Sequence, residues 1–250
     1  MNITIPQTYE ELSEQQRGVL CSILLTSSPF GGGGGRLPLR IIKTLISHLP
    51  NRTQQQLLQE VPFTALWQYA EPFLTTEKLY HFRDLTKMIA PAPRLANLTI
   101  KQFSVADSLY YRLRLSQYQD ELLLRQLMAS LYNLPDTPFD VLNLPQVAEH
   151  TDKTPITTAY EVAFAYTCCR EYIIGKYPKV FSSPSSTQRG EKPVFRKEAT
   201  YTPFSKIISV MAMDKHQPLG NWHQCNATRV YDFFEVLTES ILQAEQREKS

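Results

Sequence analysis

The chain has 250 residues, of which 42% are hydrophobic and 20% charged, and this composition excludes an intrinsically disordered protein. The 26 Lys and Arg residues nearly balance the 24 Asp and Glu residues, whereas nucleic-acid-binding proteins usually carry a basic excess, so we do not expect a nucleic-acid partner. Only 9 glycines are present. Sandwiches, barrels and Rossmann folds need glycine at many turns, so we expect an all-α protein, a multi-helix orthogonal bundle.

The first two elements are predicted from an alternation of apolar and polar residues and from a helix-capping pattern. In Ile3–Ile5, apolar and polar residues alternate before Pro6, which is typical of a short N-terminal edge strand or of an extended arm. Ser13 and Gln16 then have the spacing of a capping box, and apolar residues recur at helical spacing as far as Leu24. A first helix is therefore expected here.

A run of five glycines, Gly31–Gly35, follows this helix. A phosphate-binding loop would need Lys and then Ser or Thr after it, but Arg36 and Leu37 stand there. We interpret the run as a flexible loop, either native or an engineered replacement.

A second amphipathic helix is predicted over residues 37–49, followed by a polar stretch near Gln54. Pro62 and Pro72 are expected to divide the next, aromatic-rich region into short pieces. Residues 90–93 (Ala-Pro-Ala-Pro) form the strongest break and predict an N-terminal helical subdomain over residues 1–90 and a C-terminal one over 91–250. One continuous domain is the alternative.

The second part of the chain shows the clearest helical patterns, and the sequence has no internal repeat. Thr99 is the expected N-cap of a helix with Phe103, Ala106, Tyr110 and Leu113 on one face. Further helices are expected at residues 120–132, at about 157–177, at 203–213 and after Gly220. Residues 181–201 have no periodicity and predict a long exposed loop, and residues 244–250 should fray.

No catalytic motif stands in this sequence, so we expect neither an enzyme nor a cofactor. Serine hydrolase and zinc protease signatures are absent. His216, His223 and Cys225 form one irregular cluster rather than the paired ligands of a zinc site, so no metal site is predicted. The 4 Cys are interpreted as small buried apolar groups.

The expected location is the cytoplasm. The N-terminus lacks the basic and apolar regions of a signal peptide. No apolar run approaches the roughly 20 residues that span a bilayer, so no membrane association is expected.

Four stretches resemble small phage and prophage proteins of tail-morphogenesis gene clusters. They are Ile5–Gln16 with its Tyr-x-Glu-Leu-Ser pattern, Asn97–Asp107, Leu127–Pro135, and Trp222 with the Val230–Leu237 helix. Tyr9 stands where those proteins commonly have Trp, and the glycine run is a second departure. The resemblance implies a non-enzymatic, chaperone-like role in tail assembly, in the host cytoplasm.

A chaperone of this kind would bind another protein, such as a phage tail protein, through apolar and aromatic side chains. The expected partner-binding residues are Trp67, Tyr69, Phe73, Trp222, Phe233 and Phe234. Core packing is the alternative for each of them. A structural virion component (a connector or baseplate piece) and an unrecognised enzyme or nucleic-acid-associated factor are the alternative functions, and the oligomeric state stays open.

Overall fold

The computed structural model describes residues 4–27, 36–181 and 202–247. Across these ranges the chain forms α-helices and two 3-10 turns but no strand, which confirms the all-α prediction. The first helices are α1 (Glu14–Thr26), α2 (Arg36–Leu45), α3 (Asn51–Glu60), α4 (Phe63–Thr75), α5 (Ile100–Leu115) and α6 (Glu121–Leu131). The others are α7 (Leu144–Thr151), α8 (Ile156–Lys176), α9 (Pro178–Phe181), α10 (Phe204–Met213), α11 (Trp222–Ala227) and α12 (Val230–Arg247). The 3-10 turns are η1 (Pro93–Leu95) and η2 (Val141–Asn143).

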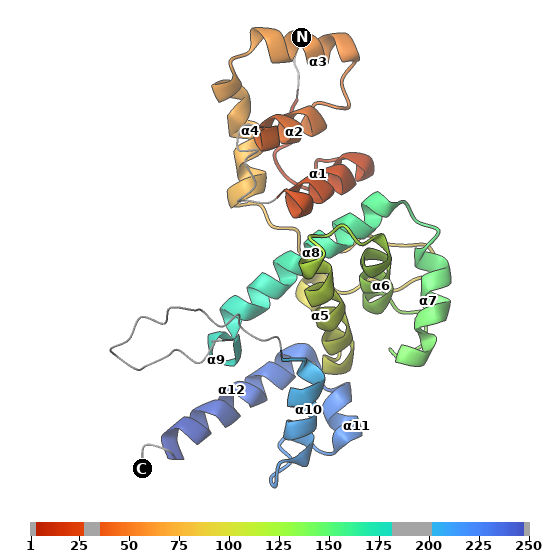
Figure 1. Ribbon diagram of the computed structural model, residues 1–250, viewed down its shortest axis with the longest axis vertical. Helices are drawn as coiled ribbons and strands as arrows, with labels where there is room; N and C mark the ends of the chain where they lie inside the picture. The colour runs from red at the N-terminus through yellow and green to blue at the C-terminus, as the bar shows by residue number, and fades with distance from the viewer. Residues whose placement is uncertain (1–3, 28–35, 182–201, 248–250) are drawn as a thin grey trace.

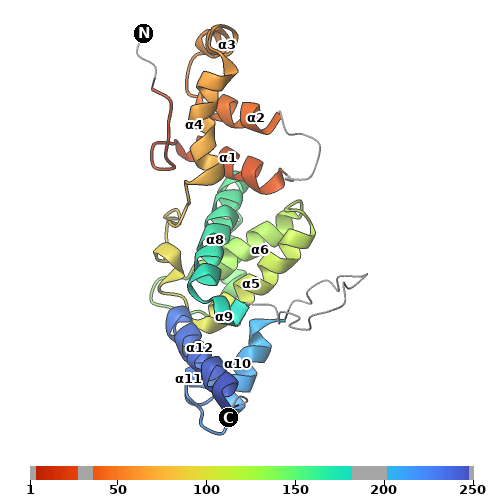
Figure 2. The same ribbon diagram turned by 90° about the vertical axis from the view of Figure 1, so that its left-hand side faces the viewer.

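The molecule is elongated, and its helices follow the chain from one end to the other (Figures 1 and 2). Helices α1–α4 lie at the N-terminal end, α5–α8 in the middle, and α9–α12 at the C-terminal end. The long helix α8 runs from the first group to the last, so one helix contacts both ends of the structure.

Two clusters of buried apolar side chains hold the helices together. The first, the N-terminal core, joins α1, α2 and α4 to Leu79 and to Ala165 of α8. The second, the C-terminal core, joins α5, α6 and α8 to α10 and α12. In the C-terminal core the predicted faces of Phe103–Leu113 and Leu123–Leu131 are buried as expected.

A local motif occurs twice, at the starts of α1 and α5, although the sequence showed no repeat. Each helix follows Leu-[Ser/Thr], and the hydroxyl of Ser13 or Thr99 accepts a hydrogen bond from the backbone N–H three residues later. The buried Gln16 then donates from Nε2 to the Thr44 and Leu45 carbonyls at the end of α2. The same bonds run from Gln102 to Ser130 and Leu131 at the end of α6. Both glutamines thus satisfy terminal carbonyls of the following helix, which fixes the α1–α2 and α5–α6 pairs in the same way.

Several sequence predictions were wrong in the N-terminal region. Thr4 and Ile5 form no strand, and Ile3 lies outside the described residues. The polar stretch after residue 50 is the helix α3, which buries none of its side chains completely and is stabilised by local bonds such as Gln56 to Glu60. Pro62 precedes α4 and Pro72 lies inside it, so this region is one helix rather than short pieces. Phe73, the residue after Pro72, is buried against Tyr9, with ring centroids 5.2 Å apart. This contact stabilises the last turn of α4.

Other differences concern the second half of the chain. Helix α7 was not expected, and the last predicted helix is two helices, α11 and α12. Helix α12 extends to Arg247, and Lys179 pairs with Glu245 at 2.9 Å near its end, while the expected fraying from residue 244 stays a prediction. The glycine run and most of the expected loop, residues 182–201, lie outside the described residues.

Candidate binding groove between α5, α6 and α7

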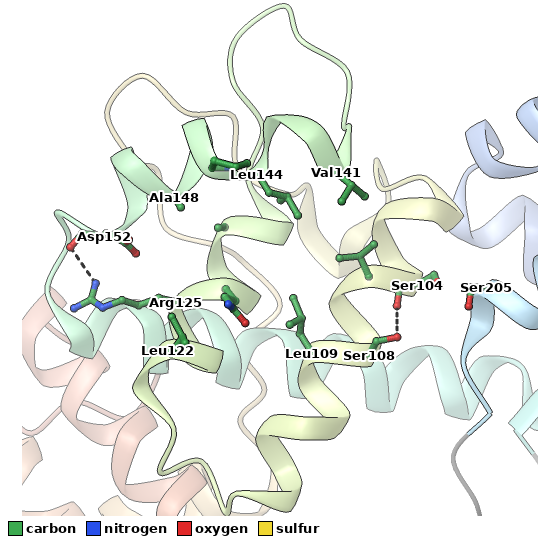
Figure 3. A pocket seen from close by; sticks show the side chains of 14 residues that line it. Ser104, Ser108, Leu109, Leu122, Arg125, Val141, Leu144, Ala148, Asp152 and Ser205 are labelled. Carbon is green, nitrogen blue, oxygen red and sulfur yellow. Dashed lines mark hydrogen bonds between the residues drawn. The ribbon is translucent and has the colours of Figure 1, made fainter.

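A groove of about 660 Å³ opens on the side of the molecule where α5, α6 and α7 meet (Figure 3). Leu122 and Leu109 lie along one side of it, and Val141, Leu144 and Ala148 along the other. The remaining lining residues are Ser104, Val105, Ser108, Arg125, Gln126, Ala129, Pro145, Asp152 and Ser205. Its volume falls within the range of about 300–1,000 Å³ typical of ligand sites.

Small side chains on α5 and α6 create the hollow. The large residues of α5, such as Phe103 and Tyr110, face the C-terminal core and leave Ser104 and Ser108 on the flank toward the groove. The Ser108 hydroxyl donates to the Ser104 carbonyl at 2.9 Å and therefore has a partner within the helix (Figure 3). Ala129 adds no bulk from α6. The floor of the groove is thus lined by small side chains. It is also less polar than its serines suggest, because the Ser108 hydroxyl is already hydrogen-bonded within α5.

Exposed apolar side chains stand at the edges of the groove. Leu122 is 65% exposed on α6, and Val141 is 44% exposed on η2. The neighbouring Leu142 is 84% exposed. An isolated exposed apolar side chain is ordinary, but a group of them beside an apolar groove indicates an interaction surface.

One end of the groove is polar and is cross-linked by the side chain of Arg125. The guanidinium of Arg125 donates to the Asp152 and Thr154 carbonyls and to the Glu121 carboxylate, so it ties α6 to the turn after α7. Among the described residues that line the groove, Asp152 carries the only carboxylate. This end thus carries the Asp152 carboxylate beside Arg125, whose guanidinium is paired with Glu121 at 3.0 Å.

The six residues expected to bind a partner lie in two regions, three in α4 and three in α11 and α12, and they differ in burial. Phe73, Phe233 and Phe234 are buried in the cores, which leaves them no surface for a partner and agrees with the alternative of core packing. Trp67 and Tyr69 are half-buried against the N-terminal core. Trp222, at the start of α11, is 45% exposed. None of the six lines the groove.

The sequence contains one signal for the groove, a run of three leucines in α6. Leu122, Leu123 and Leu124 are consecutive, and one face of a helix cannot bury three adjacent side chains. Leu123 and Leu124 are buried, and Leu122 is left at the groove edge. The position of Val141 could not be found in this way, because η2 has no periodic pattern.

None of the described residues that line the groove is a cysteine or a histidine. All four thiols are buried and free, as expected. Burial raises the pKa of Cys169 to about 12 and also raises the pKa of Cys21, Cys168 and Cys225, so these thiols stay protonated at neutral pH. His216 and His223 are exposed, and no group of three metal-ligating side chains occurs in the described ranges.

In those same ranges, no helix is both long enough and apolar enough to cross a bilayer. Comparison with protein-family models, with curated proteins and with solved structures gives no match to this chain.

Proposed function

We propose that this chain is a non-enzymatic protein-binding protein whose groove between α5, α6 and α7 receives the apolar face of a helix from another protein. The observation that supports this proposal is an apolar hollow of about 660 Å³ with Leu122 and Val141 exposed at its edges. Burial of these side chains by a partner helix would release water from apolar surface and stabilise the complex.

A helix suits this site better than an extended strand. Strand addition requires an unpaired sheet edge, and the described residues contain no sheet. Helix-in-groove recognition instead uses apolar residues at three-to-four spacing, which enter a hydrophobic groove between helices. Ser104, Ser108 and Ala129 on the floor let the partner's backbone come close. Asp152 favours a basic residue at one end of the partner helix.

The biological setting that we propose is phage or prophage tail assembly, with a tail protein as the partner. The resemblance of four short stretches to tail-morphogenesis proteins supports this setting. A chaperone-like role would require that the groove shield an apolar helix of the tail protein until assembly.

The test is co-purification with phage tail proteins, chiefly a tape measure protein, using Leu122→Lys and the matched control Leu115→Lys. Both leucines are similarly exposed, at 65% and 69%, but Leu115 does not line the groove. A lysine at position 122 places a charge where the partner's apolar face would dock, so we expect Leu122→Lys to reduce capture at least about tenfold. Leu115→Lys should capture the partner as the parent chain does.

Equal capture by the two variants would exclude the groove as the docking site. Absence of any captured tail protein, with the parent chain folded and in excess, would refute the tail-assembly setting. Binding of an apolar fluorescent dye gives an independent measure of the groove, because Leu122→Lys should weaken it and Leu115→Lys should not.

A further inference from the structure

A second depression, of about 370 Å³, lies away from the groove, where the segment before α5 meets α8 and α12. Its lining residues are Tyr80, His81, Pro93, Arg94, Ala96, Tyr172 and Tyr231. Among them, Arg94 carries the permanent charge, and none is a carboxylate.

The Arg94 guanidinium makes cation–π contacts with two tyrosine rings. Its central carbon lies 5.0 Å from the centroid of the Tyr80 ring and 4.6 Å from that of the Tyr172 ring. The two rings are 5.9 Å apart and meet at 69°, so the cation contacts both. Such cation–π contacts orient the planar guanidinium without using its N–H donors.

The backbone at this site is held in an unusual conformation. Arg94 and Leu95 have φ values of 56° and 63°, in the left-handed region that residues with a Cβ adopt at a cost. The Arg94 N–H donates to the Tyr80 carbonyl at 3.1 Å, and the Tyr231 hydroxyl donates to the Arg94 carbonyl at 2.6 Å. Strained backbone that the surroundings fix in this way is typical of functional sites.

The donors of Arg94 have no acceptor within the part of the chain that the structure describes, since neither an ion pair nor a side-chain hydrogen bond is formed by its guanidinium. The nearby carboxylates of Glu171 and Glu235 are paired with Lys78 and Lys176, each at 3.4 Å. Burial raises the pKa of Tyr80, so its hydroxyl stays protonated and can donate as well. The depression therefore offers the N–H donors of the Arg94 guanidinium, and no carboxylate among its described lining residues neutralises that charge.

We propose that this depression binds a phosphate monoester, with the phosphate oxygens on the Arg94 guanidinium and the organic group against Pro93 and Tyr231. An arginine fork matches two oxygens of a phosphate or a carboxylate. Phosphate is favoured because the exposed His81 lines the same depression and supplies a further donor, and a phosphate has more oxygens than a carboxylate to occupy both. The depression has more room than an inorganic anion needs, which favours an ester over free phosphate.

The test is calorimetric titration with phenyl phosphate, inorganic phosphate and acetate, on the parent chain and on three variants. Asn tolerates the left-handed region, so Arg94→Asn removes the charge with little added backbone strain. Arg94→Lys keeps the charge but loses the fork, and it carries the test if Arg94→Asn does not fold. Arg52→Asn, at an exposed position on α3, makes the same charge change far from the site.

We expect phenyl phosphate to bind the parent chain more tightly than the other two anions. Arg94→Asn should weaken this binding at least about tenfold, Arg94→Lys should also weaken it, and Arg52→Asn should leave it unchanged. Unchanged binding in Arg94→Asn, acetate binding as tight as that of phenyl phosphate, or no binding of any probe would overturn the proposal. In the last case Arg94 has only a structural role, as an anchor of the segment before α5.

Discussion

Glu161 places a buried carboxylate where α1, α8 and the segment after α4 meet. Its two oxygens lie 2.8 Å from Nε of Arg17 and 2.7 Å from a terminal nitrogen of Arg83. Burial raises the pKa of Glu161, while both arginines lower it. The same Arg83 also reaches Glu14, at 3.1 Å, but that carboxylate is exposed. One buried anion thus compensates two cations from different segments.

We predict that Glu161→Gln lowers the free energy of unfolding by about 3 kcal/mol, because it leaves Arg17 and Arg83 without their shared anion in a buried environment. The matched control is Glu14→Gln, which removes a carboxylate from the same Arg83 at a position 74% exposed and should cost less than about 1 kcal/mol. Urea denaturation of both variants measures the difference. Equal losses would show that the ion pairs at Glu161 contribute no more than a surface pair.

At the scale of whole elements, α1 packs closely against α8. Gly18 of α1 lies against Thr157 of α8, and a Cβ at Gly18 would come within 2.8 Å of both the Thr157 carbonyl oxygen and its Cβ. Because a backbone oxygen cannot move aside as a flexible side chain can, this contact needs glycine. A second helical glycine, Gly175 in α8, has open space around the equivalent position.

We therefore expect opposite results from the same substitution at these two glycines. Gly18→Ala should lower stability by about 1–3 kcal/mol, because α1 must move away from α8. Gly175→Ala should raise stability by about 0.5–1 kcal/mol, because alanine restricts the unfolded chain and favours the helix. Thermal unfolding of the two variants beside the parent chain measures both. A stabilising Gly18→Ala would show that the two helices do not pack as closely as described.

The helices that could be predicted are those with local sequence signals, namely an N-cap residue or a helical spacing of apolar residues. Ser13 and Thr99 cap α1 and α5 as expected, and the buried faces of α5 and α6 follow from their apolar spacing. Helix α3 could not be found from periodicity because it buries no complete side chain, and α4 continues past Pro72 because of a tertiary contact to Tyr9. The groove is lined by residues of α5, α6, α7 and α10 and of η2, so its shape depends on how these elements pack. Of its lining residues, only Leu122 could be inferred from the sequence, because it belongs to a run of three leucines.

For the whole molecule, the relation between the two predicted subdomains depends on α8. A boundary at residue 90 stays a prediction, and it leaves α8 entirely in the C-terminal part. Yet Ala165 of α8 belongs to the N-terminal core, and Phe164 packs against Tyr9 with ring centroids 5.8 Å apart. Glu161 of α8 supplies the buried anion for Arg17. The N-terminal helices therefore complete their interior with a helix from beyond the boundary.

A fragment of residues 1–90 should consequently lack a stable fold when it is made alone. Without α8, the buried faces of Leu20 and Cys21 lose the helix that α1 packs against, and Arg17 loses its anion. Such a small fragment has little spare stability to offset this loss. Circular dichroism and amide hydrogen exchange should show a weakly helical, unprotected chain, and a peptide of residues 156–176 added in trans should increase its helicity and protection. A fragment that unfolds cooperatively on its own, with no response to the peptide, would mean that the N-terminal core is complete without α8, and the boundary at residue 90 would then separate two independent domains.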